Sequence, residues 1–261
     1  MTQIDEATGA MLVRNPWSSV FSGRVAFADL GGRQTAWTAD RTEFLGRHGG
    51  PAAPAALAGT NVLSGKTGAG MDPCTALQTV LELGAGEEAE VVLFIGQCAS
   101  ADEARTLVTR YRRADLDAVL AEVTAHWTSL LGTVQVQTPD RATDIMLNGW
   151  LLYQTLACRI QARSAFYQAS GAYGFRDQLQ DGMALTLARP EITRHHILRA
   201  AARQFVEGDV QHWWLPGSGR GVRTRISDDH VWLVYATATY IASSNDAAIL
   251  DEIVPFIEGP V

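Results

Sequence analysis

The spacing of apolar residues changes near residue 100, and this change constrains the fold more than any other feature of the sequence. Before it, three short apolar runs are separated by clusters of glycine, proline and acidic residues: Val25–Ala28, Leu77–Leu83 and Val91–Ile95. Short runs between turn residues are typical of strands in an all-β unit. After Ser100, apolar residues recur every three or four positions with charges between them, which predicts helices.

The helical part is expected to begin with one or two exposed connecting helices over residues 101–131. Thr138 is a candidate cap for the next helix, with Pro139 at its first position. That helix, over residues 140–162, is apolar almost all round, and a helix of this kind is usually buried on most faces.

Two long loops, two helices and a tight turn are expected to follow, before a last helix that starts near Ser227 or Asp228. In chain order they are a loop over 163–175, a helix over 176–188, a break at Arg189 and Pro190, a helix over 191–206 and a loop over 208–226. If successive helices are antiparallel, both long loops emerge at the same end of the bundle. Loops that share an opening are common places for ligand sites in helical proteins.

Composition narrows the classes of function. The net charge of −7 argues against a nucleic-acid binder, because phosphate contacts need a concentrated basic surface. No apolar run approaches the roughly 20 residues of a membrane span, and the N-terminus shows no signal peptide. Three widely separated cysteines fit a reducing compartment. We therefore expect a cytoplasmic, soluble protein.

The stretch that contains Arg176, Asp177, Gln180 and Asp181 is dense in hydrogen-bonding side chains. On a helix, Asp177 and Asp181 share one face, and Arg176 and Gln180 share the adjacent one. Carboxylates accept hydrogen bonds from hydroxyls and a guanidinium donates in a fixed fork, so this set suits sugar recognition. Ordinary helix-start chemistry and surface ion pairs are the alternative interpretation.

The second polar loop adds Trp213 and Trp214, and the last helix begins beside Asp228 and Asp229. Indole rings stack on the C–H faces of sugars, although either tryptophan could instead anchor the loop to the core. Helix capping is the favoured role of the two acids, with ligand contact or a substitute proton donor as alternatives. The adjacent histidines His195 and His196 have no Cys or acidic residue at a spacing that would complete a set of metal ligands, so no metal site is expected.

Four segments of the sequence resemble a known family, the inverting β-glycoside phosphorylases. They are NPWSSVFSGRVAFADL with TADRTEFLGR, RSAFYQASGAYGFRDQLQDGMAL, and GDVQHWWLPGSGRGVRTRISDDHVWL. The family includes cellobiose, chitobiose and β-1,2-oligoglucan phosphorylases. The sequence is most similar to the C-terminal phosphorylase-like region of cyclic β-1,2-glucan synthases.

The resemblance implies an α+β multidomain fold. Residues 1–99 would form a partial β-sandwich, residues 100–137 a helical linker, and residues 138–261 the first helices of an (α/α)6 barrel. The family's general acid lies in a later motif, which is not found before Val261. The expectation is therefore a fragment, inactive as an isolated chain, with no catalytic residue of its own and with exposed apolar faces on its inner helices.

The resemblance also implies a mechanism. In these enzymes inorganic phosphate attacks the anomeric carbon while one Asp protonates the leaving oxygen, whereas an inverting hydrolase needs a second carboxylate to activate water. By analogy, Arg176 and Asp181 would hold hydroxyls of the non-reducing-end glucose, with Asp177 close by. No cofactor is expected, and phosphate would be a co-substrate of the full-length family.

The resulting hypothesis is a carbohydrate-active glycosyltransferase or phosphorylase module for β-linked gluco-oligosaccharides. Its expected partners are a β-glucan oligosaccharide and the remainder of a split or truncated enzyme. No nucleic acid and no membrane segment are expected, although full-length glucan synthase relatives are tethered to the inner membrane. The alternative is a non-catalytic carbohydrate-binding or scaffold remnant.

Overall fold

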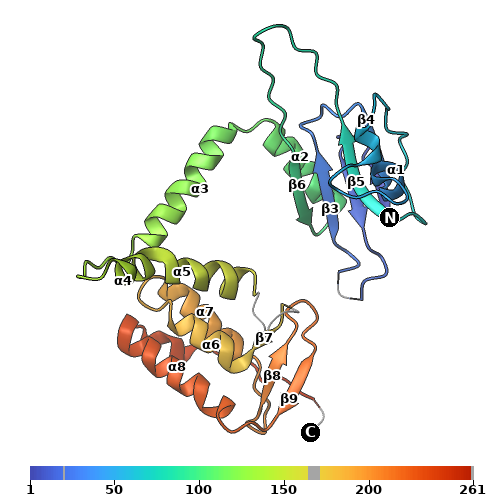
Figure 1. Ribbon diagram of the computed structural model, residues 1–261. Helices are drawn as coiled ribbons and strands as arrows, with labels where there is room; N and C mark the ends of the chain where they lie inside the picture. Colours follow the sequence, from blue (N-terminus) through green and yellow to red (C-terminus); the bar gives the residue numbers. More distant parts are fainter. Residues whose placement is uncertain (20, 164–170, 260–261) are drawn as a thin grey trace. The chain divides into compact units, whose positions relative to one another are not determined.

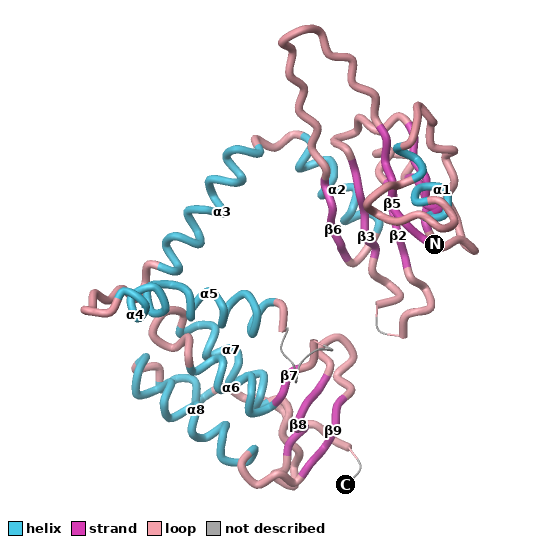
Figure 2. Tube along the Cα trace, in the orientation of Figure 1, coloured by secondary structure: helices cyan, strands magenta, loops and turns pink. Residues whose placement is uncertain are grey.

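The computed structural model describes residues 1–19, 21–163 and 171–259, and it divides into two compact units (Figures 1 and 2). The N-terminal unit is Met1–Leu120 and the C-terminal unit is Ala121–Val261. The expected division into a sandwich, a linker and a barrel stays a prediction.

The N-terminal unit is built on two antiparallel sheets. The larger has the order β1-β2-β3-β6, formed by Thr2–Ile4, Met11–Arg14, Val25–Asp29 and Phe94–Cys98. The smaller pairs β4 (Ala36–Asp40) with β5 (Pro73–Gln78). Strands were expected here, but the run Leu77–Leu83 is mostly not a strand. Because β4 begins at Ala36, opposite Gln78, it offers no residue to pair with the chain after Gln78.

One helix covers part of the larger sheet. Helix α2 (Ala101–Arg112) begins at Ser100, whose hydroxyl accepts from the Glu103 N–H, and its Val108 packs with Leu12 and Phe27. Arg112 also donates two hydrogen bonds to Asp29 of β3, at 2.6 and 2.9 Å. Two short helices, α1 (Arg41–Leu45) and η1 (Ala55–Leu57), complete the unit.

Helices dominate the second half of the chain. Helix α3 (Leu116–Leu131) contains the boundary between the two units, so residues 101–131 do form two helices. The remaining helices, all in the C-terminal unit, are α4 (Arg141–Ile145), η2 (Met146–Trp150), α5 (Leu151–Gln154), η3 (Thr155–Gln161), α6 (Phe175–Met183), α7 (Pro190–Ala201), α8 (Asp229–Ser244) and η5 (Ala247–Asp251).

The helix expected over 140–162 differs from its prediction in three ways. Its cap is Asp140 rather than Thr138, because the Asp140 carboxylate accepts from the backbone N–H of Ala142. The helix is interrupted at Asn148 and Gly149, where Gly149 has φ 122°. Its apolar residues are also less buried than expected, and the Trp150 side chain remains 50% exposed.

The interruption has a local cause. The Asn148 side chain accepts from the backbone N–H of Val136 at 2.6 Å and donates to the carbonyl of the same residue at 2.8 Å. It thereby pairs with Val136 as a neighbouring strand would. The φ of Gly149 lies in a region that glycine enters without the steric cost of a side chain.

A three-stranded antiparallel sheet replaces the long loop expected over 208–226. Its order is β7-β8-β9, formed by Tyr173–Gly174, Val210–Trp214 and Gly221–Thr224. The glycine-rich segment that suggested a loop is only the connection between β8 and β9, closed by a hydrogen bond from Leu215 N–H to the Arg220 carbonyl at 2.7 Å. The loop prediction was therefore wrong for the two strands and held for the connection between them.

The pairing of β7 with β8 tests the expectation of a shared opening. Tyr173 lies opposite Trp214 and Gly174 lies opposite Trp213, so the ends of the two long segments meet. This pairing agrees with two segments that emerge at one end of the bundle, whereas an opening shared by them stays a prediction. Residues 164–170 of the first segment lie outside them.

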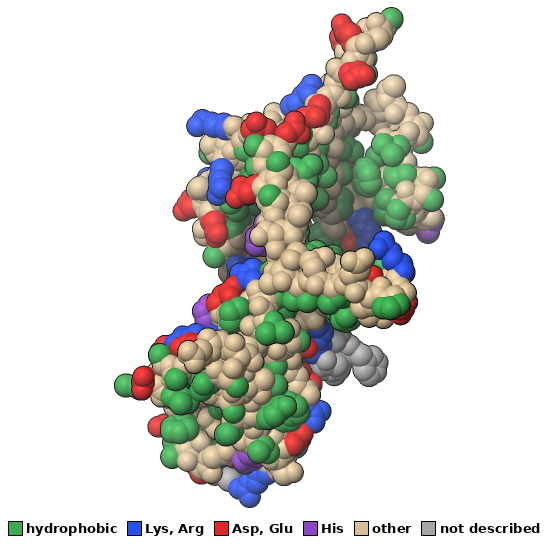
Figure 3. Space-filling model, turned by 90° about the vertical axis from the view of Figure 1, so that its left-hand side faces the viewer, with side chains coloured by type: hydrophobic (Ala, Val, Ile, Leu, Met, Phe, Trp, Pro, Cys, Tyr) green, Lys and Arg blue, Asp and Glu red, His purple; other side chains and the backbone are tan. Residues whose placement is uncertain are grey.

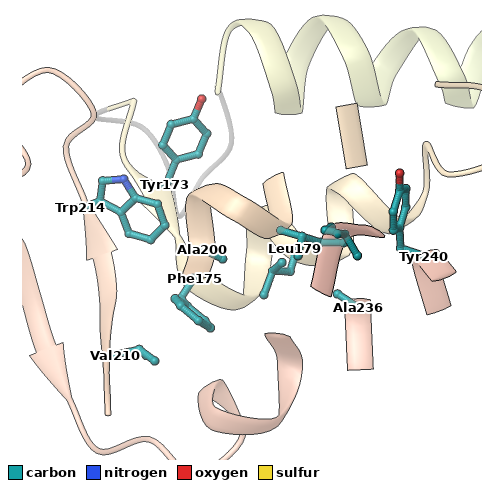
Figure 4. Close-up of a cluster of buried hydrophobic side chains, with 10 residues drawn as sticks. Tyr173, Phe175, Leu179, Ala200, Val210, Trp214, Ala236 and Tyr240 are labelled. Carbon is teal, nitrogen blue, oxygen red and sulfur yellow. The ribbon is translucent and has the colours of Figure 1, made fainter. Parts of the chain in front are cut away.

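The core of the C-terminal unit forms where this sheet meets the helices (Figure 4). Its buried side chains come from β7, α6, α7, β8, α8 and η5: Tyr173, Phe175, Leu179, Ile197, Ala200, Val210, Trp214, Ala236, Tyr240 and Ile249. Trp214 and Phe175 are among the largest fully buried side chains. The start of α6 and the strand β8 are thus fixed to one another through shared packing.

Apolar side chains also remain on the outside of this unit (Figure 3). On α8 they include Val231, Val234 and Tyr235, at 60%, 67% and 56% exposure, which lie on one face because of their spacing. Among the described residues, no helix combines the length and apolar character that crossing a membrane requires.

Candidate functional site

Two consecutive acids at the start of α8 hold side chains from two other elements. The Asp228 carboxylate accepts from Arg176 of α6 at 2.5 Å, and the Asp229 carboxylate bonds His212 Nδ1 of β8 at 2.7 Å. Capping was the favoured role of these acids, but Asp228 occupies the cap position without a side-chain capping bond. Its carboxylate is directed to Arg176 instead.

Electrostatics couple Arg176 to this helix start. The hydrogen bond from Arg176 lowers the pKa of Asp228, and the same bond raises the pKa of Arg176. Asp177 and Asp229 add smaller contributions in the same direction to the pKa of Arg176. Both members of the pair are partly exposed, at 47% for Arg176 and 42% for Asp228, so a ligand could reach them.

Asp177 lies in the first turn of α6, over the preceding glycine. A Cβ atom at Gly174 would lie 2.0 Å from Asp177 Oδ2, so the carboxylate would have to shift if any larger residue stood there. The glycine therefore leaves room for the Asp177 carboxylate in its present position. The first turn of a helix is also where a negative charge is favourable, because the helix dipole is positive there.

Asp181 forms its ion pair with Arg159 and not with the nearby Arg176. Arg159 of η3 contacts it at 2.6 Å, and the two side chains are only 16% and 17% exposed. Burial raises the pKa of Asp181, although Arg159 opposes that effect. Asp177 also raises it slightly, which agrees with the predicted shared face of Asp177 and Asp181. Gln180 is exposed on the same helix.

The two tryptophans separate into a core residue and a surface residue. Trp214 is 1% exposed and packs against Tyr173, with ring centroids 5.7 Å apart. Trp213 is 39% exposed. Adjacent residues of a strand point to opposite faces, so the sheet itself divides the pair. Trp213 is the one that offers a ring face to a ligand.

His212 is a candidate that the sequence reasoning did not weigh. It stands directly before the tryptophan pair, and its place in the HWW motif was the available signal. Only its bond to Asp229, 17 residues later, shows that it belongs with the acids.

Of the adjacent histidines His195 and His196, only the second is buried and has a structural role. His196 is 3% exposed, and its Nδ1 contacts the Gln178 side chain. Burial lowers the pKa of His196 from 6.5 to about 3, so the ring is neutral at physiological pH. His195 is exposed. Within the described part of the chain, no three His, Cys, Asp or Glu side chains form a group that could hold a metal ion.

Comparison with known proteins shows to which family this chain belongs. The family model for the glycosyl hydrolase 94 catalytic domain matches residues 126–260, and the model for the glycosyl hydrolase 94 supersandwich domain matches residues 1–114. The chain belongs to the glycosyl hydrolase 94 superfamily. All eight residues proposed from the sequence, and His212, fall within the match to the catalytic domain of the glycosyl hydrolase 94 superfamily.

Similar curated proteins include a synthase and two phosphorylases. The chain is 50% identical to the cyclic beta-(1,2)-glucan synthase NdvB of Rhizobium meliloti, over 100% of the chain and 9% of that protein. It is 27% identical to an N,N'-diacetylchitobiose phosphorylase of Vibrio proteolyticus, over 71% of the chain and 27% of that protein. A solabiose phosphorylase of Paenibacillus borealis is also 27% identical, over 89% of the chain and 29% of that protein.

These relatives confirm the predicted membership of the glycosyl hydrolase 94 superfamily, with a supersandwich domain followed by catalytic-domain sequence. The chain spans less than a third of the length of each of these three relatives. Activity, substrates and partners of a whole protein are therefore matters for proposal.

Proposed function

We propose that the C-terminal unit supplies part of the non-reducing-end glucose subsite of a phosphorylase or glycosyltransferase that acts on β-linked gluco-oligosaccharides. The observation that supports this most is the start of α8, where Asp228 bonds Arg176 and the next residue, Asp229, bonds His212. Similarity to glucan synthase and phosphorylase sequences supports the class of substrate.

The side chains have complementary roles toward a hexose. Arg176 donates in a fixed fork, whereas Asp177 and Asp228 accept from hydroxyls. Trp213 offers an exposed ring face to the apolar side of a pyranose. Asp181 would contribute through its oxygen atoms while Arg159 compensates its charge. Gln180 and Asp229 belong to the same predicted set, as does Trp214, which would act from the core by supporting Trp213.

The proposal extends to the architecture and to the reaction. Helices from α4 to α8 would be the first helices of an (α/α)6 barrel, in a module that spans residues 138–261 after a sandwich at 1–99 and a linker at 100–137. Inorganic phosphate would be the co-substrate, and the proton donor would not be one of the residues named here. A cytoplasmic location is also part of the proposal.

Calorimetric titration with the β-1,2-linked glucose trisaccharide tests the binding site. Arg176→Lys keeps the charge but removes the two-pronged donor, so we expect about tenfold weaker binding. Arg141→Lys is the matched control, because Arg141 is exposed on α4 in the same unit. Equal affinity of wild type and Arg176→Lys would remove Arg176 from the site.

Phosphate consumption in the presence of β-1,2- or β-1,4-linked gluco-oligosaccharides tests the chemistry. Binding without phosphate consumption by the chain would favour the non-catalytic carbohydrate-binding alternative for the chain on its own. Phosphate-dependent cleavage would show that the chain contains a proton donor. Replacing both Asp228 and Asp229 by Asn would then test whether either acid serves as that donor.

A further inference from the structure

His212 lies at an irregularity of its sheet. Between β8 and β9 the register shifts between Gln211 and Trp213, so His212 is the extra residue of a β-bulge. Bulges are common beside functional sites because they change the direction of one side chain. Here the ring is directed to Asp229, whose side chain is 1% exposed.

The bond to Asp229 determines which ring nitrogen carries the proton. A carboxylate oxygen accepts hydrogen bonds, so His212 Nδ1 is the donor at 2.7 Å. In the neutral ring the other nitrogen, Nε2, is then an acceptor. The His212 side chain is 38% exposed although its Nδ1 faces a buried group, so a ligand can reach part of the ring. Among the described residues none is recorded as a partner of Nε2.

Arg176, which bonds the acid next to Asp229, provides the complementary function. It is held by Asp228, the residue next to Asp229, and the charge of Asp229 also contributes to the raised pKa of Arg176. Arg176 can only donate hydrogen bonds, whereas neutral His212 can only accept through Nε2. Two hydroxyls of one ligand would therefore have opposite roles, one accepting from Arg176 and one donating to His212.

We propose that His212 recognises a donating hydroxyl of the sugar, and that Asp229 is the positioning residue that fixes its tautomer. This inference rests on the proposed glucose site. It specifies that this sugar hydroxyl is the hydrogen-bond donor, and replacing the hydroxyl by fluorine or a methyl ether removes the donated hydrogen. A glucoside with fluorine in place of this one hydroxyl should bind weakly, even though its size and ring shape are nearly retained.

Two substitutions separate the two ring nitrogens. In His212→Asn the amide nitrogen can take the place of Nδ1 and keep the bond to Asp229, but no atom replaces Nε2. In His212→Gln the amide reaches the place of Nε2 and gives up the bond to Asp229. His195→Asn is the matched control, because His195 is an exposed histidine of α7 in the same unit.

Calorimetry with the β-1,2-linked glucose trisaccharide measures the effect on binding. We expect a dissociation constant about three- to tenfold higher for His212→Asn, the effect of one lost hydrogen bond, and no change for His195→Asn. The singly fluorinated sugar that binds the wild type more weakly than the parent sugar should bind His212→Asn as tightly as the parent sugar does. Unchanged binding by His212→Asn overturns the inference and leaves the glucose site standing.

Long-range ¹H–¹⁵N spectra of the histidine rings test the tautomer without any ligand. We expect the proton on Nδ1 in the wild type, and a shift toward the form protonated on Nε2 in Asp229→Asn. A wild-type ring protonated on Nε2 alone overturns the inference. If the wild type does not bind the trisaccharide, the proposed glucose site fails and the inference falls with it.

Discussion

Arg159 and Asp181 form an ion pair in which both side chains are more than four-fifths buried, yet the pKa of Asp181 is raised. Removing the carboxylate from water costs more than the guanidinium returns, which is common for buried pairs. The pair therefore sets the position of α6 against η3 more than it stabilises the fold.

An asymmetric mutational response follows from this pair. Arg159→Met should destabilise the C-terminal unit by about 2 kcal/mol, because it leaves a buried carboxylate without its cation, whereas Asp181→Asn should cost less. Urea unfolding followed by tryptophan fluorescence measures both, and the double substitution isolates their coupling. Equal losses from the two single substitutions would contradict this account.

The same carboxylate should leave a signature in the pH dependence of stability. A raised pKa means that the folded state holds the proton more tightly than the unfolded chain, so stability falls as pH rises from the ordinary value of 3.8 through the folded value. Asp181→Asn should remove this fall. The difference between wild-type and variant unfolding free energies across that pH range is the measurement.

His196 predicts the opposite slope. Its folded pKa of about 3 is far below 6.5, so the unfolded chain takes up the proton first as pH falls. Its contribution to stability is full above about pH 6.5 and declines toward pH 3, by at most about 1.4 kcal/mol per pH unit. His196→Gln should flatten this slope, whereas His195→Gln on the same helix should not.

Asn148 should be more important for stability than an interrupted helix suggests. Asn148→Ala loses both hydrogen bonds to Val136, and we expect a loss of about 1–3 kcal/mol. Asn148→Asp is the sharper comparison, because a carboxylate accepts from the Val136 N–H but repels its carbonyl. Thermal unfolding should rank wild type above both variants, and an Asp variant as stable as wild type would contradict the pairing.

Gly174 should control the position of Asp177. Gly174→Ala places a methyl group on the Asp177 carboxylate, so that carboxylate must leave its present position. We expect weaker trisaccharide binding from Gly174→Ala and little further loss when Asp177→Ala is added. Trisaccharide titration of the single and double variants measures this, and fully additive losses would show that Gly174 acts elsewhere.

The sequence predicted those parts of the fold that depend on local patterns. The change of period near residue 100 was correct because strands and amphipathic helices differ in the spacing of their apolar residues. The meeting of the two long segments was also correct for the described residues, since it follows from alternating helix direction. The strand β8 was missed because adjacent glycines and polar residues resemble a loop when the partner strand is unknown.

The candidate site was predictable in its members but not in their pairings. Arg176 and Asp228 are 52 residues apart, and only folding makes them neighbours. Local rules favoured capping for Asp228, and the long-range contact with Arg176 prevailed over that local bond. His212 was missed for the same reason, because its buried partner Asp229 is distant in sequence and unremarkable as a helix-start residue.

The burial of Trp214 has a consequence for strand alignment. A slip of β8 by one residue against β7 would exchange the faces of every side chain along it, which would place Trp213 in the core and Trp214 in water. The same slip would turn His212 away from Asp229. The burial of the Trp214 indole therefore fixes the register of β8 that the bond between His212 and Asp229 requires. A change that let either tryptophan fill the core would loosen the core packing and the polar site together.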